Sequence, residues 1–291
     1  MRPAAFDYRA PATLGEALAL LAAHPGAKLL AGGQSLVPVL NLRLAAPPLL
    51  VDLRRIPELA RSVLEHDGAL TLGAMTRHRV FERDARVRAA QPLAAAAVPH
   101  IAHVAIRNRG TIGGSLCHAD PAAEWPAVTL ACDAAMTIAG SAGTRTVDAA
   151  DFFTGLFETA VGTGEILTAV RFPAWPARRR HGFAEVARRH GDFALVGVAA
   201  AVDLDERGAV ALARIAVFGA ADAPVLAQEA AQALVGRRGE GAAREAGRLA
   251  RARIAPRSDH HASAEYRSEL VEVLVRRALG QALGVAPAKA A

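Results

Sequence analysis

The chain has 291 residues, 52% of them hydrophobic and 21% charged, which predicts a folded globular protein and excludes a disordered one. The formal charge of +6 comes from scattered arginines, and the few aromatic side chains do not alternate with them, which argues against nucleic-acid binding. The two cysteines, Cys117 and Cys132, are too few for a four-thiolate iron–sulfur cluster, so any such cluster is expected on another chain.

The amino-terminal part is predicted to alternate short strands and helices. Its first residues lack the pattern of a signal peptide, and the apolar run at residues 18–23 is too short to span a membrane, so we expect a cytoplasmic protein. Thr13 and Glu16 have the spacing of a capping box and predict a helix over residues 14–23. Strands are expected at residues 6–8, 28–31 and 49–53.

The middle of the chain continues this mixed pattern. The pair Asp67-Gly68 lies between strand-like runs and predicts a hairpin, and a second hairpin is expected around Gly143. Helices are predicted over residues 76–83, 91–102 and 125–132, and a strand over 166–172. Residues 173–178 carry two prolines and begin a run of charge, which predicts a domain boundary after residue 175.

After this boundary the sequence predicts an antiparallel sheet of three strands backed by helices, so the fold class of the whole chain is α+β. The strands are expected at residues 183–189, 194–204 and 211–218, with a turn at 205–208. The helices are expected at residues 223–235, 240–254 and 264–283.

Two glycine-rich motifs have the composition of anion-binding loops. The first is Ala31-Gly32-Gly33-Gln34-Ser35-Leu36, directly after a predicted strand. The second is Arg109-Gly110-Thr111-Ile112-Gly113-Gly114-Ser115, which lacks both the GxGxxG pattern and the lysine of a P-loop. Glycines let backbone N–H groups come close to a phosphate because no Cβ blocks the approach. An ordinary turn is the alternative for each motif alone, but the pair suits a ligand whose phosphates are bound from two sides.

With these motifs in this order, the chain resembles the FAD-binding subunits of the molybdenum hydroxylases, such as the medium subunit of aerobic carbon monoxide dehydrogenase and its xanthine-dehydrogenase-like relatives. The resemblance also includes residues 6–8, 50–54 and 185–194 and covers nearly the whole chain. It implies an FAD-binding domain of the vanillyl-alcohol-oxidase (PCMH) type over residues 1–175, with subdomains of about 1–55 and 56–175. Residues 176–291 would form a C-terminal domain of the carbon monoxide dehydrogenase flavoprotein type.

The resemblance implies that FAD is the cofactor. Backbone N–H groups of both glycine motifs would hold the diphosphate and nearby flavin atoms, while Thr111 and Ser115 would add hydroxyl donors. Glu124 stands where the family usually has Asp and would accept hydrogen bonds from sugar hydroxyls; an acidic residue in a first helical turn is the alternative. The cofactor-binding residues implied are Ala31, Gly32, Gly33, Gln34, Ser35, Leu36, Ile101, Thr111, Ile112, Gly113, Gly114, Ser115, Glu124, Leu167, Glu185 and Phe193.

Four of these residues are expected beside the cofactor through their side chains. Ile101 and Leu167 match positions that line it, although plain core packing would look the same in the sequence. Phe193 stands where some relatives have Tyr near the flavin ring, and Glu185 where some have Lys. The absence of that cation would disfavour the anionic reduced flavin.

The resemblance further implies a small partner subunit with two [2Fe-2S] clusters, a large molybdenum subunit, a dimer of heterotrimers and an external electron acceptor. Two alternatives stay open: a self-sufficient flavin oxidase or dehydrogenase of the same fold, and a non-enzymatic assembly or binding subunit. The short C-terminal part argues against the first, and the intact glycine motifs argue against the second. The ten histidines offer no complete set of metal ligands.

Overall fold

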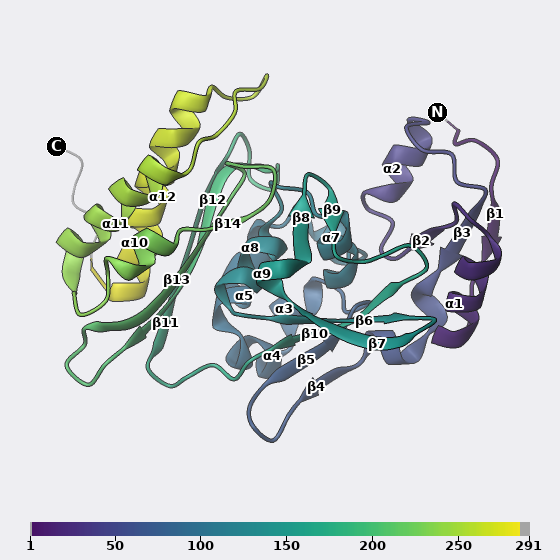
Figure 1. Ribbon diagram of the computed structural model, residues 1–291, viewed down its shortest axis with the longest axis horizontal. Coiled ribbons are helices and arrows are strands. Elements are labelled where there is room, and N and C mark those ends of the chain that lie inside the picture. Colours follow the sequence, from purple (N-terminus) through teal and green to yellow (C-terminus); the bar gives the residue numbers. More distant parts are fainter. Residues whose placement is uncertain (1, 286–291) are drawn as a thin grey trace.

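The computed structural model describes residues 2–285 and is built around three main sheets that follow one another along the chain (Figure 1). The first sheet is parallel, with strand order β1-β3-β2. Helix α1 connects β1 to β2 along the chain. The Thr13 hydroxyl accepts from the Glu16 N–H and Glu16 accepts from the Ala12 N–H, so this helix begins where the sequence predicts. The elements are β1 (Asp7–Arg9), α1 (Leu14–Ala23), β2 (Lys28–Leu30), α2 (Leu36–Asn41) and β3 (Leu49–Asp52).

The second sheet is antiparallel, with strand order β4-β5-β10-β6-β7. Both predicted hairpins are confirmed, since β4 pairs with β5 and β6 pairs with β7. The strands are β4 (Ser62–Leu64), β5 (Leu70–Gly73), β6 (Ala135–Gly140), β7 (Gly143–Asp148) and β10 (Ile166–Phe172). The connections contain α3 (Arg79–Arg83), α4 (Ala85–Ala90), α5 (Pro92–Ala97), the short 3-10 helix η3 (Val98–His100), α6 (Val104–Arg107), α7 (Ile112–His118), α8 (Glu124–Ala131), α9 (Ala149–Phe152), and the hairpin of β8 (Phe153–Gly155) and β9 (Glu158–Thr159).

The third sheet has the order β11-β12-β13-β14, and α11 and α12 cover one of its faces (Figure 1). Side chains along its strands alternate between two cores because successive residues point to opposite faces. Val198 and Ala200 pack toward those helices, whereas Ala199, Phe183 and Phe218 join the core of the second sheet. The elements are β11 (Arg179–Ala187), β12 (Ala194–Leu204), β13 (Val210–Phe218), β14 (Val225–Leu226), α10 (Gln228–Gln232), α11 (Gly239–Arg253) and α12 (Ala264–Leu283).

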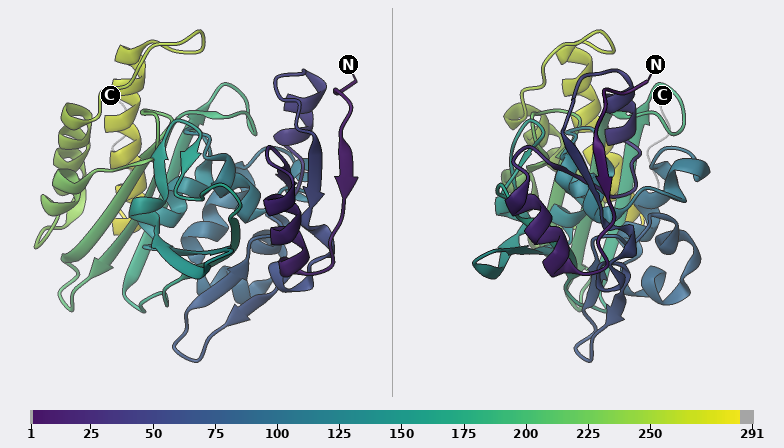
Figure 2. Two further views of the ribbon diagram at one scale, coloured as in Figure 1. Left: turned by 45° about the vertical axis from the view of Figure 1, so that its right-hand side comes forward. Right: turned by 90° about the vertical axis from the view of Figure 1, so that its right-hand side faces the viewer.

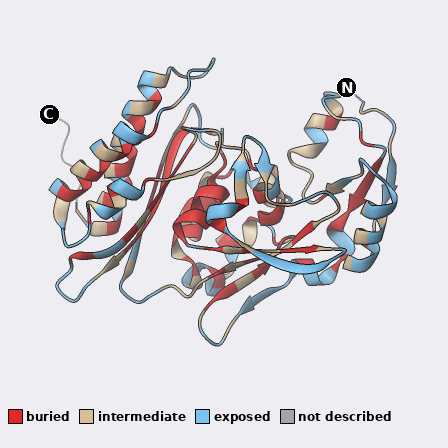
Figure 3. Ribbon diagram, in the orientation of Figure 1, coloured by how far each residue is buried: buried red, intermediate tan, exposed pale blue. Residues whose placement is uncertain are grey.

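The third sheet is therefore a central layer with a hydrophobic core on each side. Figure 2 shows the first sheet and helices α11 and α12 at opposite ends of the molecule. Figure 3 shows the buried residues concentrated along β12 and β13 and around α8, between these ends. Helix α8 is buried along its whole length and packs against β12 and β13. No helix within residues 2–285 is long and apolar enough to cross a lipid bilayer.

Several predicted elements differ from the observed ones. The helix expected over residues 91–102 is α5 followed by η3, because Pro99 lacks the N–H that a continuing helix would need. The helix expected over 76–83 begins only at Arg79. The helix expected over 223–235 is reduced to α10, since Val225 and Leu226 form β14, so the predicted three-stranded sheet has a fourth, short strand.

Candidate functional site

The two glycine motifs, far apart in the sequence, are in direct contact. A Cβ placed on Gly32 would overlap the carbonyl oxygen of Arg109 and lie 2.7 Å from the Cα of Gly110. A Cβ on Gly114 would lie 3.3 Å from the Cβ of Ala31. Only glycine fits at position 32 without moving backbone atoms, so Gly32 allows the two motifs to pack directly against each other.

The first motif offers a row of backbone donors. Within the described chain, the N–H groups of Gly32, Gly33, Gln34 and Ser35 form no hydrogen bond, and all four residues are half-buried. Gly33 has a φ of +72°, which glycine adopts readily, and the Gln34 side chain donates to the Gly32 carbonyl at 3.0 Å. Consecutive N–H groups without a protein partner can bind an anionic oxygen.

The second motif differs from expectation because it is mostly helical. Helix α7 begins at Ile112 with Thr111 as its N-cap, and its first N–H groups are all bonded within the protein. The bonds run from Ile112 to the Thr76 carbonyl, from Gly113 to the Ala74 carbonyl, from Gly114 to the Thr111 hydroxyl and from Ser115 to the Thr111 carbonyl. These four N–H groups therefore have acceptors within the protein, unlike those of the first motif, and their contact with a diphosphate stays a prediction. The hydroxyl hydrogens of Thr111 and Ser115 are the donors that this motif can offer.

The two acidic residues of the predicted site are both buried. Glu185 on β11 has a side chain only 5% exposed, and its Oε1 lies 3.2 Å from Nδ1 of His100, while its Oε2 has no hydrogen-bond partner in the described part of the chain. Glu124 is the first residue of α8, and burial, followed by the nearby charge of Glu185, raises its pKa to about 8. Near neutral pH the Glu124 carboxyl is therefore mostly protonated and can donate as well as accept.

The three apolar residues of the predicted site lie in different environments. Ile101 is buried after η3, and its carbonyl accepts from Nη1 of Arg107 at 3.0 Å. Leu167 is buried on β10. The carbonyl of the next residue, Thr168, accepts from the N–H of Ala74, whose own carbonyl accepts from Gly113 of the second glycine motif. Phe193 lies between β11 and β12 and is 61% exposed, so it is not packed into the protein core.

A buried pair that could not be predicted from the sequence, Trp125 and His78, connects helix α8 to the second glycine motif. The indole N–H of Trp125, next to Glu124, donates to Nδ1 of His78 at 2.9 Å. The backbone N–H of His78 in turn donates to the Gly110 carbonyl at 3.1 Å. Burial lowers the pKa of His78 to about 3, so the ring is neutral with its proton on Nε2. No local pattern links residues 47 positions apart, which is why the sequence alone does not identify the pair.

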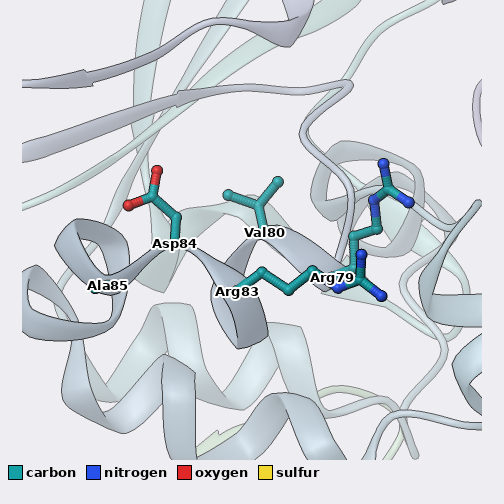
Figure 4. A pocket seen from close by; sticks show the side chains of 5 residues that line it. All are labelled: Arg79, Val80, Arg83, Asp84 and Ala85. Atoms are coloured by element: carbon teal, nitrogen blue, oxygen red, sulfur yellow. The ribbon is translucent and has the colours of Figure 1, made fainter.

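Two hollows of the surface are lined by residues other than those of the predicted site. Figure 4 shows one of them, lined by Arg79, Val80, Arg83, Asp84 and Ala85 of α3 and α4. A second lies between α4, α5 and His181. Within residues 2–285, no three His, Cys, Asp or Glu side chains are arranged to hold a metal ion.

Comparison with known proteins gives matches along nearly the whole chain. Residues 4–175 match the FAD binding domain in molybdopterin dehydrogenase, and residues 181–282 match the CO dehydrogenase flavoprotein C-terminal domain. The chain is 39% identical to the 6-hydroxypseudooxynicotine dehydrogenase complex subunit alpha of Paenarthrobacter nicotinovorans, over 97% of this chain and 96% of that protein. It is 36% identical to the carbon monoxide dehydrogenase medium chain of Afipia carboxidovorans, over 97% and 98% of the two chains.

A solved structure has the same fold. A chain of quinoline 2-oxidoreductase from Pseudomonas putida 86 superposes with a TM-score of 0.93 and 41% identity, covering 98% of this chain and 99% of that one. The predicted fold class, FAD as the cofactor and the predicted family are confirmed by these matches. The chain belongs to the family of FAD-binding medium subunits of the molybdenum hydroxylases, and it is an oxidoreductase flavoprotein.

Proposed function

We propose that this chain is the electron-transfer subunit of a molybdenum hydroxylase complex, taking electrons from [2Fe-2S] clusters of a partner subunit and passing them to an external acceptor. The observation that carries the proposal is the contact of Gly32 with Arg109 and Gly110, beside four consecutive N–H groups that have no hydrogen-bond partner among residues 2–285. Such a surface suits the diphosphate of FAD. Bound FAD supplies a centre that exchanges electrons singly or in pairs, which connects one-electron clusters to a two-electron acceptor.

Different residues of the site would bind different parts of FAD. The N–H groups of residues 32–35 would hold the diphosphate, with Ala31 and Leu36 at the ends of that motif. Residues 111–115 would support the first motif and add the hydroxyls of Thr111 and Ser115. Glu124 would bind sugar hydroxyls, while Ile101, Leu167, Phe193 and Glu185 would lie beside the rest of the cofactor.

Partner subunits are part of the proposal. This chain has only two cysteines, and Cys132 is buried, so clusters that deliver electrons would be carried by a small [2Fe-2S] subunit. A large molybdenum subunit would oxidise the organic substrate, in a dimer of heterotrimers. The relatives named as a complex subunit and a medium chain support such an assembly.

The domain division is proposed as residues 1–175, with subdomains of about 1–55 and 56–175, and residues 176–291. The first sheet ends at Asp52, the second ends at Phe172 and the third begins at Arg179, which supports both borders. The core is nevertheless continuous across the second border, because Phe183 and Phe218 pack with residues of the second sheet. We therefore expect residues 1–175 and 176–291 to unfold together.

The experiment that tests electron transfer is anaerobic reduction of the flavin, followed by absorption, in the chain alone and in a preparation co-expressed with the two partner subunits. We expect substrate of the molybdenum subunit to bleach the flavin only when both partners are present. Equal bleaching by an organic substrate in the isolated chain would favour the self-sufficient oxidase. An assembled complex whose clusters are reduced while the flavin stays oxidised would contradict the proposal.

A further inference from the structure

We propose that Arg267, near the start of α12, is a positioning residue of the cofactor site. It holds the point at which the third sheet is bonded to the segment in front of Glu124. The proposal rests on the proposed function, because Glu124 and Phe193 are residues expected beside FAD. Arg267 would act through the backbone of Leu195 and Gly219, and it would give the C-terminal helices a part in cofactor binding.

The Arg267 guanidinium is buried and joins three segments of the chain. The residue is only 7% exposed. Its Nη1 donates to the Leu195 carbonyl at 2.6 Å and to the Gly219 carbonyl at 2.8 Å, while its Nη2 donates to Oδ2 of Asp259 at 2.7 Å. A charge removed from water is costly unless such partners replace the water. One side chain therefore fastens the start of β12 and the end of β13 to the loop before α12.

The carbonyl of Leu195 belongs to an irregular part of the sheet. Between β11 and β12 the register passes over Leu195, which lies between the paired residues Ala194 and Val196, and the register between β12 and β13 begins only after it. A bulged residue is left out of the ladder and bends its strand. Arg267 supplies a donor to this residue. The direction of Phe193, two residues earlier, therefore depends on a bulge that Arg267 fixes.

Gly219 connects Arg267 to the segment in front of α8. Its φ is +75°, and a Cβ on Gly219 would lie 2.7 Å from the Leu195 carbonyl oxygen, so glycine allows both carbonyls to reach one guanidinium. While its carbonyl accepts from Arg267, its N–H donates to the Pro121 carbonyl at 2.7 Å. A shift of Gly219 would therefore be passed to Pro121.

The segment from Pro121 to Glu124 is short and is bonded within itself. Asp120 accepts from the Ala122 N–H at 2.9 Å through Oδ1 and from the Ala123 N–H at 3.0 Å through its carbonyl. This is the turn that an aspartate side chain commonly forms with the backbone two residues on. Glu124 follows directly as the buried first residue of α8, so its position depends on where this turn is held.

The start of α8 is bonded on its other side to the glycine motifs. Trp125 donates to His78, and the backbone N–H of His78 donates to the Gly110 carbonyl. Glu124 is thus placed between two attachments, one to the second glycine motif and one to the third sheet. Arg267 secures the second attachment, which explains why a residue of the last helix would affect FAD binding.

Asp259 keeps the guanidinium in its place. Burial opposes ionisation of this carboxyl, but the N–H groups of His261 and Ala262 and the Arg267 guanidinium lower the pKa of Asp259 to about 2. The carboxylate is therefore charged near neutral pH and balances Arg267. Its side chain is 45% exposed, so a change at Asp259 disturbs the pair more gently than a change at Arg267.

The far end of α8 offers a matched control. Arg214 on β13 donates from Nε to the Leu130 carbonyl at 3.3 Å and from Nη2 to Asp133, so it bonds the C-terminal end of α8 to the same sheet. Arg214→Lys alters an arginine of the same kind at the end of α8 opposite to Glu124. A general loosening of α8 would follow from either change, whereas a positioning effect is expected only at the first end.

The structural part is tested without FAD, by hydrogen exchange of the cofactor-free chain followed by mass spectrometry. Arg267→Lys keeps the positive charge but replaces the planar fork of donors by a single ammonium. We expect faster exchange over residues 119–125 and 217–220 in Arg267→Lys and, to a smaller degree, in Asp259→Asn, and wild-type exchange there in Arg214→Lys. Unchanged exchange of both segments in whichever of the first two variants folds would overturn the inference.

The effect on the cofactor site is tested by the FAD dissociation constant and by the visible circular dichroism of the bound flavin. We expect Arg267→Lys to weaken FAD binding about tenfold and to alter the dichroism. Asp259→Asn should act in the same direction, while Arg214→Lys should keep wild-type values of both. Wild-type values in Arg267→Lys and Asp259→Asn, or equal changes in Arg214→Lys, would overturn the inference. A wild-type chain that binds no FAD would instead contradict the proposed function, and the exchange result would still decide whether Arg267 holds this junction.

Discussion

Trp125 and His78 form a buried hydrogen bond, 2.9 Å long, from the indole N–H to Nδ1 of the imidazole. The bond connects α8, which begins with Glu124, to the residue whose N–H holds the Gly110 carbonyl. Since Gly110 touches Gly32, the acidic end of α8 and the first glycine motif are joined through two neutral, buried side chains. The relative position of the two parts of the site therefore depends on the imidazole remaining neutral, with Nδ1 free to accept.

We predict that His78 makes the fold sensitive to acid. Its pKa is about 3 in the folded chain and about 6.5 when unfolded, so its contribution is complete above pH 6.5 and is lost as the pH falls toward 3. At pH 5 the loss in the free energy of unfolding should be about 2 kcal/mol. Urea denaturation at pH 8 and pH 5 should show a smaller loss in His78→Gln, whose amide oxygen can still accept from Trp125. Equal losses in the wild type, His78→Gln and the control His66→Gln, at an exposed histidine, would refute this prediction.

Two glycine-to-alanine changes should have opposite effects on stability. Gly15 lies inside α1 with open space where a Cβ would be, so Gly15→Ala should raise the free energy of unfolding by about 0.5–1 kcal/mol. Gly32→Ala would push a methyl group into the Arg109 carbonyl and should lower the free energy of unfolding by about 1–3 kcal/mol. Chemical denaturation of both variants measures the difference. A stabilising Gly32→Ala would show that the motifs are not in close contact.

Arg107 is predicted to hold the segment around Ile101 in place. Its guanidinium, nearly buried, donates to Glu82 and to the carbonyls of Ile101 and Ala102. A lysine ammonium cannot reach all of these acceptors, so Arg107→Lys should lower the free energy of unfolding by about 3 kcal/mol.

The control for this change is Arg86→Lys, which alters a surface ion pair with Asp84. Exposed pairs contribute little, so the loss in the free energy of unfolding should be far smaller than that of Arg107→Lys. Comparable losses in the two variants would mean that the buried contacts of Arg107 add nothing to stability.

Local signals explain which elements could be predicted. Helix α1 is capped by Thr13, and helix α12 is capped by Ser263 and followed by Gly284 with a φ of +64°, so both match their predicted bounds. Helix α7 was missed because glycines usually mark loops, and its start is fixed by bonds to Ala74 and Thr76, which lie far away in the sequence. Local patterns carry no information about such contacts.

For the site as well, the sequence identified the local motifs but not the contacts between distant segments. Glycine composition and family resemblance pointed to both motifs, but not to the difference in their hydrogen bonding, because Ile112 and Gly113 donate to carbonyls far away in the sequence. The pairing of Glu185 with His100 and of Trp125 with His78 joins separate elements, so it needed the folded chain. Whether the sixteen residues named from the sequence contact FAD stays a prediction.

The most direct test of the central claim is the mass and amount of the cofactor that heat releases from the purified chain, in the wild type and in Gly32→Ala. We predict FAD at about one molecule per wild-type chain, and a clear loss in Gly32→Ala, because separating the two motifs displaces the N–H groups of residues 32–35. A colourless wild-type chain that also fails to bind added FAD would contradict the claim.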